Sequence, residues 1–92
     1  MDIVKVFGTN VKKYRLEKGL SQEKFAEICD LHRTYISDIE CFRRSISLEN
    51  IQKIADALEI ETYKLFIVNW AVEFFFWILE RNFSKCKKLK NK

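Results

Sequence analysis

"QEKFAEICDLHRTYISDIEC", residues 22–41, is the stretch of sequence that decides the fold. It holds two short runs in which apolar residues recur at helical spacing, separated by a turn of three residues. Ala26 stands where the two helices would cross, and so small a side chain lets their backbones approach. Ile36 and Ile39 share one face of the second helix, and we expect them to hold it on a core. The stretch therefore predicts two short helices packed across a tight turn.

The opposite face of the second helix is polar. It carries four residues at positions i, i+1, i+4 and i+5, which lie together on a helix: Arg33, Thr34, Ser37 and Asp38. A face of short polar side chains with an arginine at its N-terminal end suits entry into the major groove of DNA, which is about 12 Å wide. A helix face that is merely solvated has the same composition, so these residues alone leave both interpretations open.

The segments on either side also have helical patterns. Residues 2–19 end at Gly19, a residue type that often stops helices, and place four apolar residues at helical spacing: Ile3, Phe7, Val11 and Tyr14. Ser21 and Ser47 are suited to cap the helices that follow them, because a serine hydroxyl accepts from the free N–H groups of a first turn. The helix after Ser47 is predicted to turn five residues inward: Leu48, Ile51, Ile54, Ala55 and Leu58. A fifth helix is predicted from Thr62 onward.

Composition favours an all-α domain. The 92 residues suffice for one small core, and 48% of them are hydrophobic, including eight Phe and two Trp. The chain has no Pro and only two Gly, whereas strand-rich folds need many tight turns. The net charge is +4, but residues 1–66 carry eleven basic and eleven acidic groups, and residues 81–92 carry six basic groups and no acid. Net charge alone therefore does not indicate nucleic-acid binding.

Residues for metal or catalytic chemistry are scarce. The three cysteines, Cys29, Cys41 and Cys86, lack the spacing of zinc ligands, and His32 is the single histidine. The sequence contains no nucleophile–base set and no phosphate-binding loop. We therefore expect no metal, no cofactor and no enzymatic activity. Asp2 and the lack of an apolar run of signal-peptide length at the start predict a cytoplasmic protein.

The chain from Phe7 onward resembles the Cro/repressor-type (XRE-like) helix-turn-helix family over roughly residues 7–66. The pattern R-x-x-K-G-L-S-Q leads into residue 22, "ISDIE" ends the next helix, and "SLENIQKIADALEI" matches the usual fourth helix. Within the family, "LHRTYISDIE" looks most like the controller proteins of restriction–modification systems. The resemblance implies a five-helix, lambda-repressor-like domain. It also implies a transcriptional regulator that binds double-stranded DNA as a homodimer.

The resemblance also implies residue roles. Base reading falls to five residues of the second helix of the motif: Arg33, Thr34, Tyr35, Ser37 and Asp38. Phosphate contact falls to five others: Gln22, Arg43, Arg44, Ser45 and Ser47. For Tyr35, packing at the rim of the core is an equal alternative. For Asp38 the alternatives are a cytosine amino group, a nearby guanidinium, or water. His32 is expected to be a surface residue or a weak helix cap, with phosphate contact as the alternative. Arg15 and Glu40 are expected to form a structural ion pair that orients the reading helix.

Three positions depart from the family pattern. Asp30 stands where the family usually has Gly, because the turn needs a positive φ, and Asp is among the few other residues that tolerate it. Phe42 stands where the family often has Gly, and Ile46 replaces a frequent Pro. We expect these replacements to leave the fold intact and to alter the loop after the reading helix.

The last third of the chain is apolar and then basic. We divide the sequence into a DNA-binding domain (1–66), an extended apolar C-terminal helix (67–81) and a basic, disordered tail (82–92). Wound from Thr62, this helix has one polar strip: Thr62, Asn69, Glu73 and Glu80. A helix that is apolar on nearly all sides needs a partner. A second copy is predicted to cover Val68, Val72, Phe75 and Leu79, while Phe66, Trp70 and Trp77 face the chain's own domain; the two sides are interchangeable.

Two alternatives to the dimer remain at this point. Residues 65–79 are shorter than the roughly 20 apolar residues of a membrane span and include Asn69 and Glu73, so a membrane is the less favoured partner. The other alternative is a protein-interaction module, such as an antitoxin-type or phage-repressor-like subunit, whose aromatic helix holds a different protein. A stable homodimer of the purified protein would favour the DNA-binding regulator.

Overall fold

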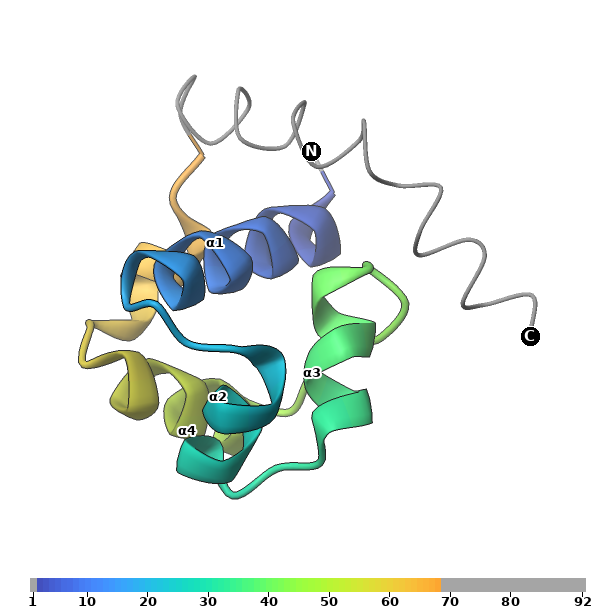
Figure 1. The fold of residues 1–92 in the computed structure, drawn as a ribbon. Helices are drawn as coiled ribbons and strands as arrows, with labels where there is room; N and C mark the ends of the chain where they lie inside the picture. The colour runs from blue at the N-terminus through green and yellow to red at the C-terminus, as the bar shows by residue number, and fades with distance from the viewer. Residues whose placement is uncertain (1, 69–92) are drawn as a thin grey trace.

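The structure is a computed structural model that describes residues 2–68. These residues form helices and connecting turns with no strand, as predicted. The elements are α1 (Ile3–Glu17), α2 (Gln22–Cys29), α3 (Arg33–Glu40), α4 (Leu48–Leu58) and a short 3₁₀ helix, η1 (Thr62–Phe66). Figure 1 shows α1 lying across one side of the domain, with α3 at the right and α2 and α4 beneath it.

Side chains cap the helices at their N-termini. The Ser21 hydroxyl accepts a hydrogen bond from the Lys24 N–H at 3.0 Å, and the Ser47 hydroxyl accepts from the Asn50 N–H at 3.2 Å. Both caps confirm the predicted helix starts, and each satisfies an N–H group that the helix itself leaves unpaired. Asp2 caps α1 in the same way, accepting from the Val4 N–H at 3.0 Å.

Three turns use a left-handed backbone at residues other than glycine. Asp30 ends α2 with φ 59° and ψ 45°, which confirms that it adopts the turn conformation usual for Gly. Glu59 ends α4 with the same φ of 59°. Phe42 has φ 63°, so it adopts a glycine-like conformation although bulky side chains rarely do so.

The hydrophobic core lies between α1, α2, α3, α4 and η1. Its members include Phe25 and Cys29 of α2 and most of the residues predicted at helical spacing: Phe7, Val11, Ala26, Ile36, Ile39, Ile54, Ala55 and Leu58. The prediction of an inward side chain is wrong for Leu48, which is 83% exposed, and Ile3, which shares the helical spacing of the α1 core residues, is 52% exposed. Each is the first residue of its helix. Spacing along a helix shows which face is apolar, but it does not show which residues of that face are covered by another helix.

Cys29 behaves as an apolar core residue. It is a free, buried thiol at the end of α2. Burial raises the pKa of this thiol to about 12, although the positive charge of Lys53 acts in the opposite direction. The thiol therefore stays protonated and unreactive in the folded protein near neutral pH.

Gly8 permits the close approach of α1 to the end of α3. A Cβ at this position would overlap the carbonyl oxygen of Ile39 and lie 2.9 Å from the ring of Phe42. The missing side chain therefore lets the Phe42 ring fold back against α1. The contact of this ring with α1 helps to hold Phe42 in its left-handed conformation at the start of the loop after α3.

The predicted fifth helix is wrong in its form. The chain from Thr62 forms a 3₁₀ helix of five residues, and Ile67 is extended, with φ −75° and ψ 127°. The side-chain amide of Asn10 donates to the carbonyl of Leu65 at 2.8 Å and to that of Ile67 at 3.3 Å. These carbonyls are tied to α1, and the Leu65 side chain is fully buried, so tertiary contacts bend the chain away from a continuous helix. Of the polar strip predicted along an unbroken helix, only Thr62 lies within the described residues.

Of the predicted dimer stripe, only Val68 lies within the described residues, and it is 39% exposed. Phe66 packs against Phe7, with ring centroids 5.3 Å apart, on the side of its own domain. The rest of the predicted C-terminal helix and the basic tail lie outside the described residues. Within residues 2–68, no helix has the length and apolar character needed to cross a bilayer.

Candidate nucleic-acid interface

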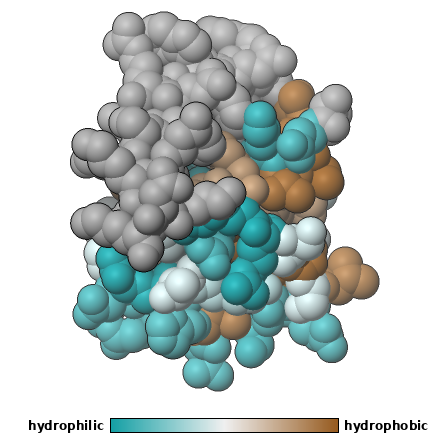
Figure 2. Space-filling view, turned by 90° about the vertical axis from the view of Figure 1, so that its right-hand side faces the viewer, coloured by the Kyte–Doolittle hydropathy of each residue, from teal (hydrophilic) through white to brown (hydrophobic). Residues whose placement is uncertain are grey.

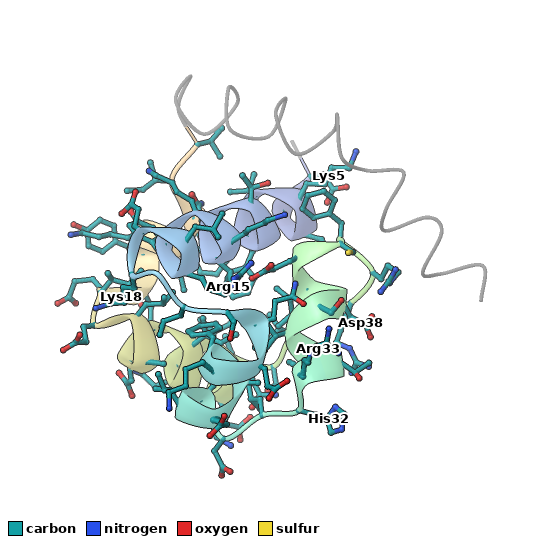
Figure 3. The ribbon with its side chains drawn as sticks, viewed as in Figure 1. Lys5, Arg15, Lys18, His32, Arg33 and Asp38 are labelled. Atoms are coloured by element: carbon teal, nitrogen blue, oxygen red, sulfur yellow. The ribbon has the colours of Figure 1, made fainter. Side chains whose placement is uncertain are left out.

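The polar face of α3 is the outer face of the helix-turn-helix pair. Arg33 and Thr34 are exposed, Ser37 and Asp38 are half-buried, and Ile36 and Ile39 on the opposite side are buried in the core. Figure 3 shows Arg33 and Asp38 projecting from α3, with His32 at its start. Figure 2 views the molecule from the α3 side, where most of the described surface is hydrophilic. The core thus holds the helix by one face and leaves the other accessible.

A buried ion pair fixes the orientation of α3 relative to α1. The Arg15 Nε donates to Glu40 Oε2 at 2.7 Å and a second guanidinium nitrogen donates to Oε1 at 3.0 Å. The two side chains are only 7% and 2% exposed. The third guanidinium nitrogen of Arg15 donates to the carbonyl of Leu20 at 2.6 Å, so the pair also holds the turn before α2.

Gln22 joins this buried group. Its side-chain amide donates to Glu40 Oε1 at 3.0 Å, so α1, α2 and α3 meet at one carboxylate. The expected contact of Gln22 with a phosphate must therefore use the other N–H of its side-chain amide or its backbone N–H. The network gives Gln22 a structural role that the sequence pattern did not predict.

Asp38 holds both arginines of the loop after α3. Arg43 donates from Nε and from a terminal nitrogen to Asp38 Oδ1, at 3.2 and 2.8 Å. Arg44 donates to Asp38 Oδ2 at 3.4 Å. Of the alternatives for Asp38, this geometry corresponds to the nearby guanidinium. One carboxylate thus neutralises one of the two positive charges predicted to contact phosphate.

Tyr35 connects the loop to α4. The Arg44 guanidinium lies over the Tyr35 ring at 4.6 Å from its centroid, and the Tyr35 hydroxyl accepts from the Asn50 side-chain amide at 2.9 Å. Tyr35 is half-buried, and its hydroxyl is anchored at the rim of the domain. Asn50 was not predicted as a site residue. In the sequence it is only a polar residue in the first turn of α4, and its contact depends on how α4 approaches α3.

The remaining predicted residues lie around this surface. Ser45 and Ser47 are exposed in the loop, and Ser47 also caps α4. His32 is the N-cap of α3, its Nδ1 accepting from the Thr34 N–H at 3.1 Å. Residues 2–68 contain no group of three or more His, Cys, Asp or Glu side chains placed to hold a metal ion. What this part of the chain offers is an exposed polar helix face flanked by a basic loop.

The helix-turn-helix family matches residues 11–65 of this sequence. This range includes the second half of α1, all of α2, α3 and α4, and most of η1. The chain belongs to this family. Individual relatives also share much of the sequence. The control protein C.BamHI of Bacillus amyloliquefaciens is 56% identical over 57 residues, which cover 61% of this chain and 70% of that protein.

Solved structures of controller proteins match the fold. The restriction–modification controller protein C.AhdI of Aeromonas hydrophila has a TM-score of 0.67 and 43% identity, covering 68% of this chain and 96% of that one. The controller C.Esp1396I, solved as a tetramer with its natural 35 base-pair operator, has a TM-score of 0.67 and 30% identity over 84% of this chain and 97% of that one. Within the helix-turn-helix family, this protein is therefore similar to the controllers of restriction–modification systems.

Proposed function

We propose that this protein is a sequence-specific regulator of transcription that binds a double-stranded DNA operator as a homodimer and controls a restriction–modification system. The observation that carries the proposal is the exposed polar face of α3 beside the basic loop, held in place by the Arg15–Glu40 pair. The similarity to controller proteins supports it, since one of them is solved on its operator.

In this proposal α3 enters the major groove. Arg33 donates two parallel hydrogen bonds to the O6 and N7 atoms of a guanine, and Thr34 offers its methyl group to a thymine. Ser37 and Asp38 complete the reading face, and Tyr35 borders it. Two copies related by a two-fold axis place two reading helices on two half-sites, so we expect a palindromic operator.

Phosphate contacts fix the position of this helix without choosing the sequence. They come from Arg43, Arg44, Ser45, Ser47 and the remaining donor capacity of Gln22. The protein acts in the cytoplasm, on the DNA of the cell, and its proposed work is binding rather than catalysis.

Selection of bound sites from a pool of random duplexes tests the proposal. The purified protein is expected to enrich one palindromic sequence and to bind it at least about 10³-fold more tightly than random duplex DNA at physiological salt. A control with Arg33→Ala is expected to enrich this sequence less strongly than the wild-type protein does. Recovery of unrelated sequences by the wild-type protein would contradict the proposed function.

A further inference from the structure

The carboxylate of Asp38 is placed unusually for a DNA-binding surface. It lies on the reading face of α3, one helical turn after Thr34, and it receives three hydrogen bonds from the two arginines of the adjacent loop. These side chains are only partly accessible: Asp38 is 20% exposed, Arg43 22% and Arg44 44%. The guanidiniums that would clamp phosphates are therefore held by a group that phosphates repel.

We infer that Asp38 is a specificity-determining residue that restrains Arg43 and Arg44 until the operator is bound. This inference rests on the proposed function. On random DNA, Arg43 and Arg44 stay hydrogen-bonded to Asp38. The loop then faces the DNA phosphates with one net positive charge instead of two. On the operator, a cytosine amino group at the floor of the groove donates to Asp38. The carboxylate then has a new partner, and the arginines move onto phosphates.

The charges of the loop explain why this exchange selects for sequence. Each phosphate contact lowers the slope of log affinity against log salt by about 0.9, so at 0.1 M salt one contact contributes about eightfold in affinity to any duplex. A carboxylate that withholds one contact on random DNA lowers nonspecific affinity by that factor. Where a base supplies a donor to Asp38, the contact is recovered. The stacking of Arg44 on Tyr35 limits how far its guanidinium must move.

The test is the variant Asp38→Asn, which removes the charge and keeps the shape of the side chain. Binding to a mixed-sequence duplex and to the operator selected by the wild-type protein is measured across a series of salt concentrations. On mixed-sequence DNA we expect affinity to rise about eightfold at 0.1 M salt and the salt slope to steepen by about 0.9. On the operator we expect unchanged or lower affinity, because the asparagine oxygen accepts from the cytosine amino group more weakly, and this loss offsets the removed repulsion of the phosphates. The ratio of operator to random affinity should thus fall by at least about eightfold.

The matched control is Asp56→Asn, which removes the same charge from an exposed position on α4, where the carboxylate accepts a hydrogen bond from the Gln52 amide. Its salt slope on random DNA is expected to equal that of the wild type. Adding Arg44→Ala to Asp38→Asn is expected to abolish the gain. Unfolding cannot imitate tighter binding, so the expected result distinguishes the inference from damage to the fold.

Two outcomes would overturn the inference. Random-DNA affinity and slope equal to the wild type would show that Asp38 restrains nothing. An equal rise on operator and random DNA would show a general charge effect without a role in specificity. If the wild-type protein selects no operator at all, the proposed function fails instead, so the two failures are distinguishable.

Discussion

At the scale of single residues, the arginines of this surface have different surroundings and different expected roles. Arg33 is exposed at the start of α3, whereas Arg43 and Arg44 are tied to Asp38, and Arg15 is buried against Glu40. The same side chain thus serves base reading, backbone contact and structural support. The position of each arginine relative to the core decides which of these three roles it has.

Arg33→Ala is expected to weaken operator binding by roughly 1–3 kcal/mol and to leave random-DNA binding nearly intact, because the lost hydrogen bonds go to base edges. Titration of the variant on operator and on mixed-sequence duplex measures both. Equal loss on the two DNAs would assign Arg33 to the backbone and contradict base reading.

Arg44→Ala is expected to weaken binding to every duplex and to lower the magnitude of the salt slope by about 1, because it removes one positive charge from the loop. Affinity measured across a salt series gives the slope directly. Lys18→Ala is a suitable control, since Lys18 pairs with Glu59 at the far end of α1. An unchanged slope in Arg44→Ala would exclude the phosphate contact.

At the scale of elements, the Glu40 carboxylate joins three helices. It receives hydrogen bonds from Arg15 on α1 and Gln22 on α2, while belonging to α3 itself. Both charges are almost completely buried, so neither is stabilised by water once its partner is removed.

Glu40→Ala is therefore expected to lower the free energy of unfolding by about 3–5 kcal/mol, because it leaves the Arg15 guanidinium buried and unpaired. Urea denaturation measures this change. The double variant Arg15→Met/Glu40→Leu removes both charges and is expected to recover most of the loss. If it recovers stability but its operator affinity stays low, the pair orients α3. A double variant with full affinity would limit the pair to a role in stability.

At the scale of the whole molecule, we expect dimerisation through an interface built largely from residues between Leu65 and Leu79, with Val68 in its stripe. This stretch is rich in aromatic residues, and each of these buries about 150–250 Å² when it is covered. Exposed apolar patches of that size are rare on monomers. The break at Ile67 changes where such a helix can begin, but not its composition.

Replacing Phe75 and Leu79 together with Glu is expected to give a monomer with weakened operator binding, because one half-site supplies too few contacts. Sedimentation and operator titration measure the two effects. Leu16→Glu/Ile28→Glu adds the same charge at positions 49% exposed on α1 and α2 and should remain a dimer. If the Phe75/Leu79 variant stays dimeric with wild-type affinity, the interface lies elsewhere. A wild type that is soluble only with detergent would indicate a membrane partner instead.

The sequence by itself determined the four α-helices, the caps at Ser21 and Ser47, the turn at Asp30 and most of the core. These depend on contacts between residues a few positions apart, which periodicity and capping chemistry describe well. The family pattern also pointed to Arg15 with Glu40 and to the polar face of α3, both of which the sequence places at recognisable positions.

Only the tertiary structure decided which groups these side chains meet across the fold. The exposure of Leu48, the short 3₁₀ helix after Glu61, the bond from Asn50 to Tyr35 and the shared carboxylate of Asp38 all depend on where a distant element ends. Asn10 illustrates the reason, since its amide binds carbonyls 55 and 57 residues away and so competes with local helix formation. Helical spacing describes one element at a time, whereas burial and pairing are set where two elements meet.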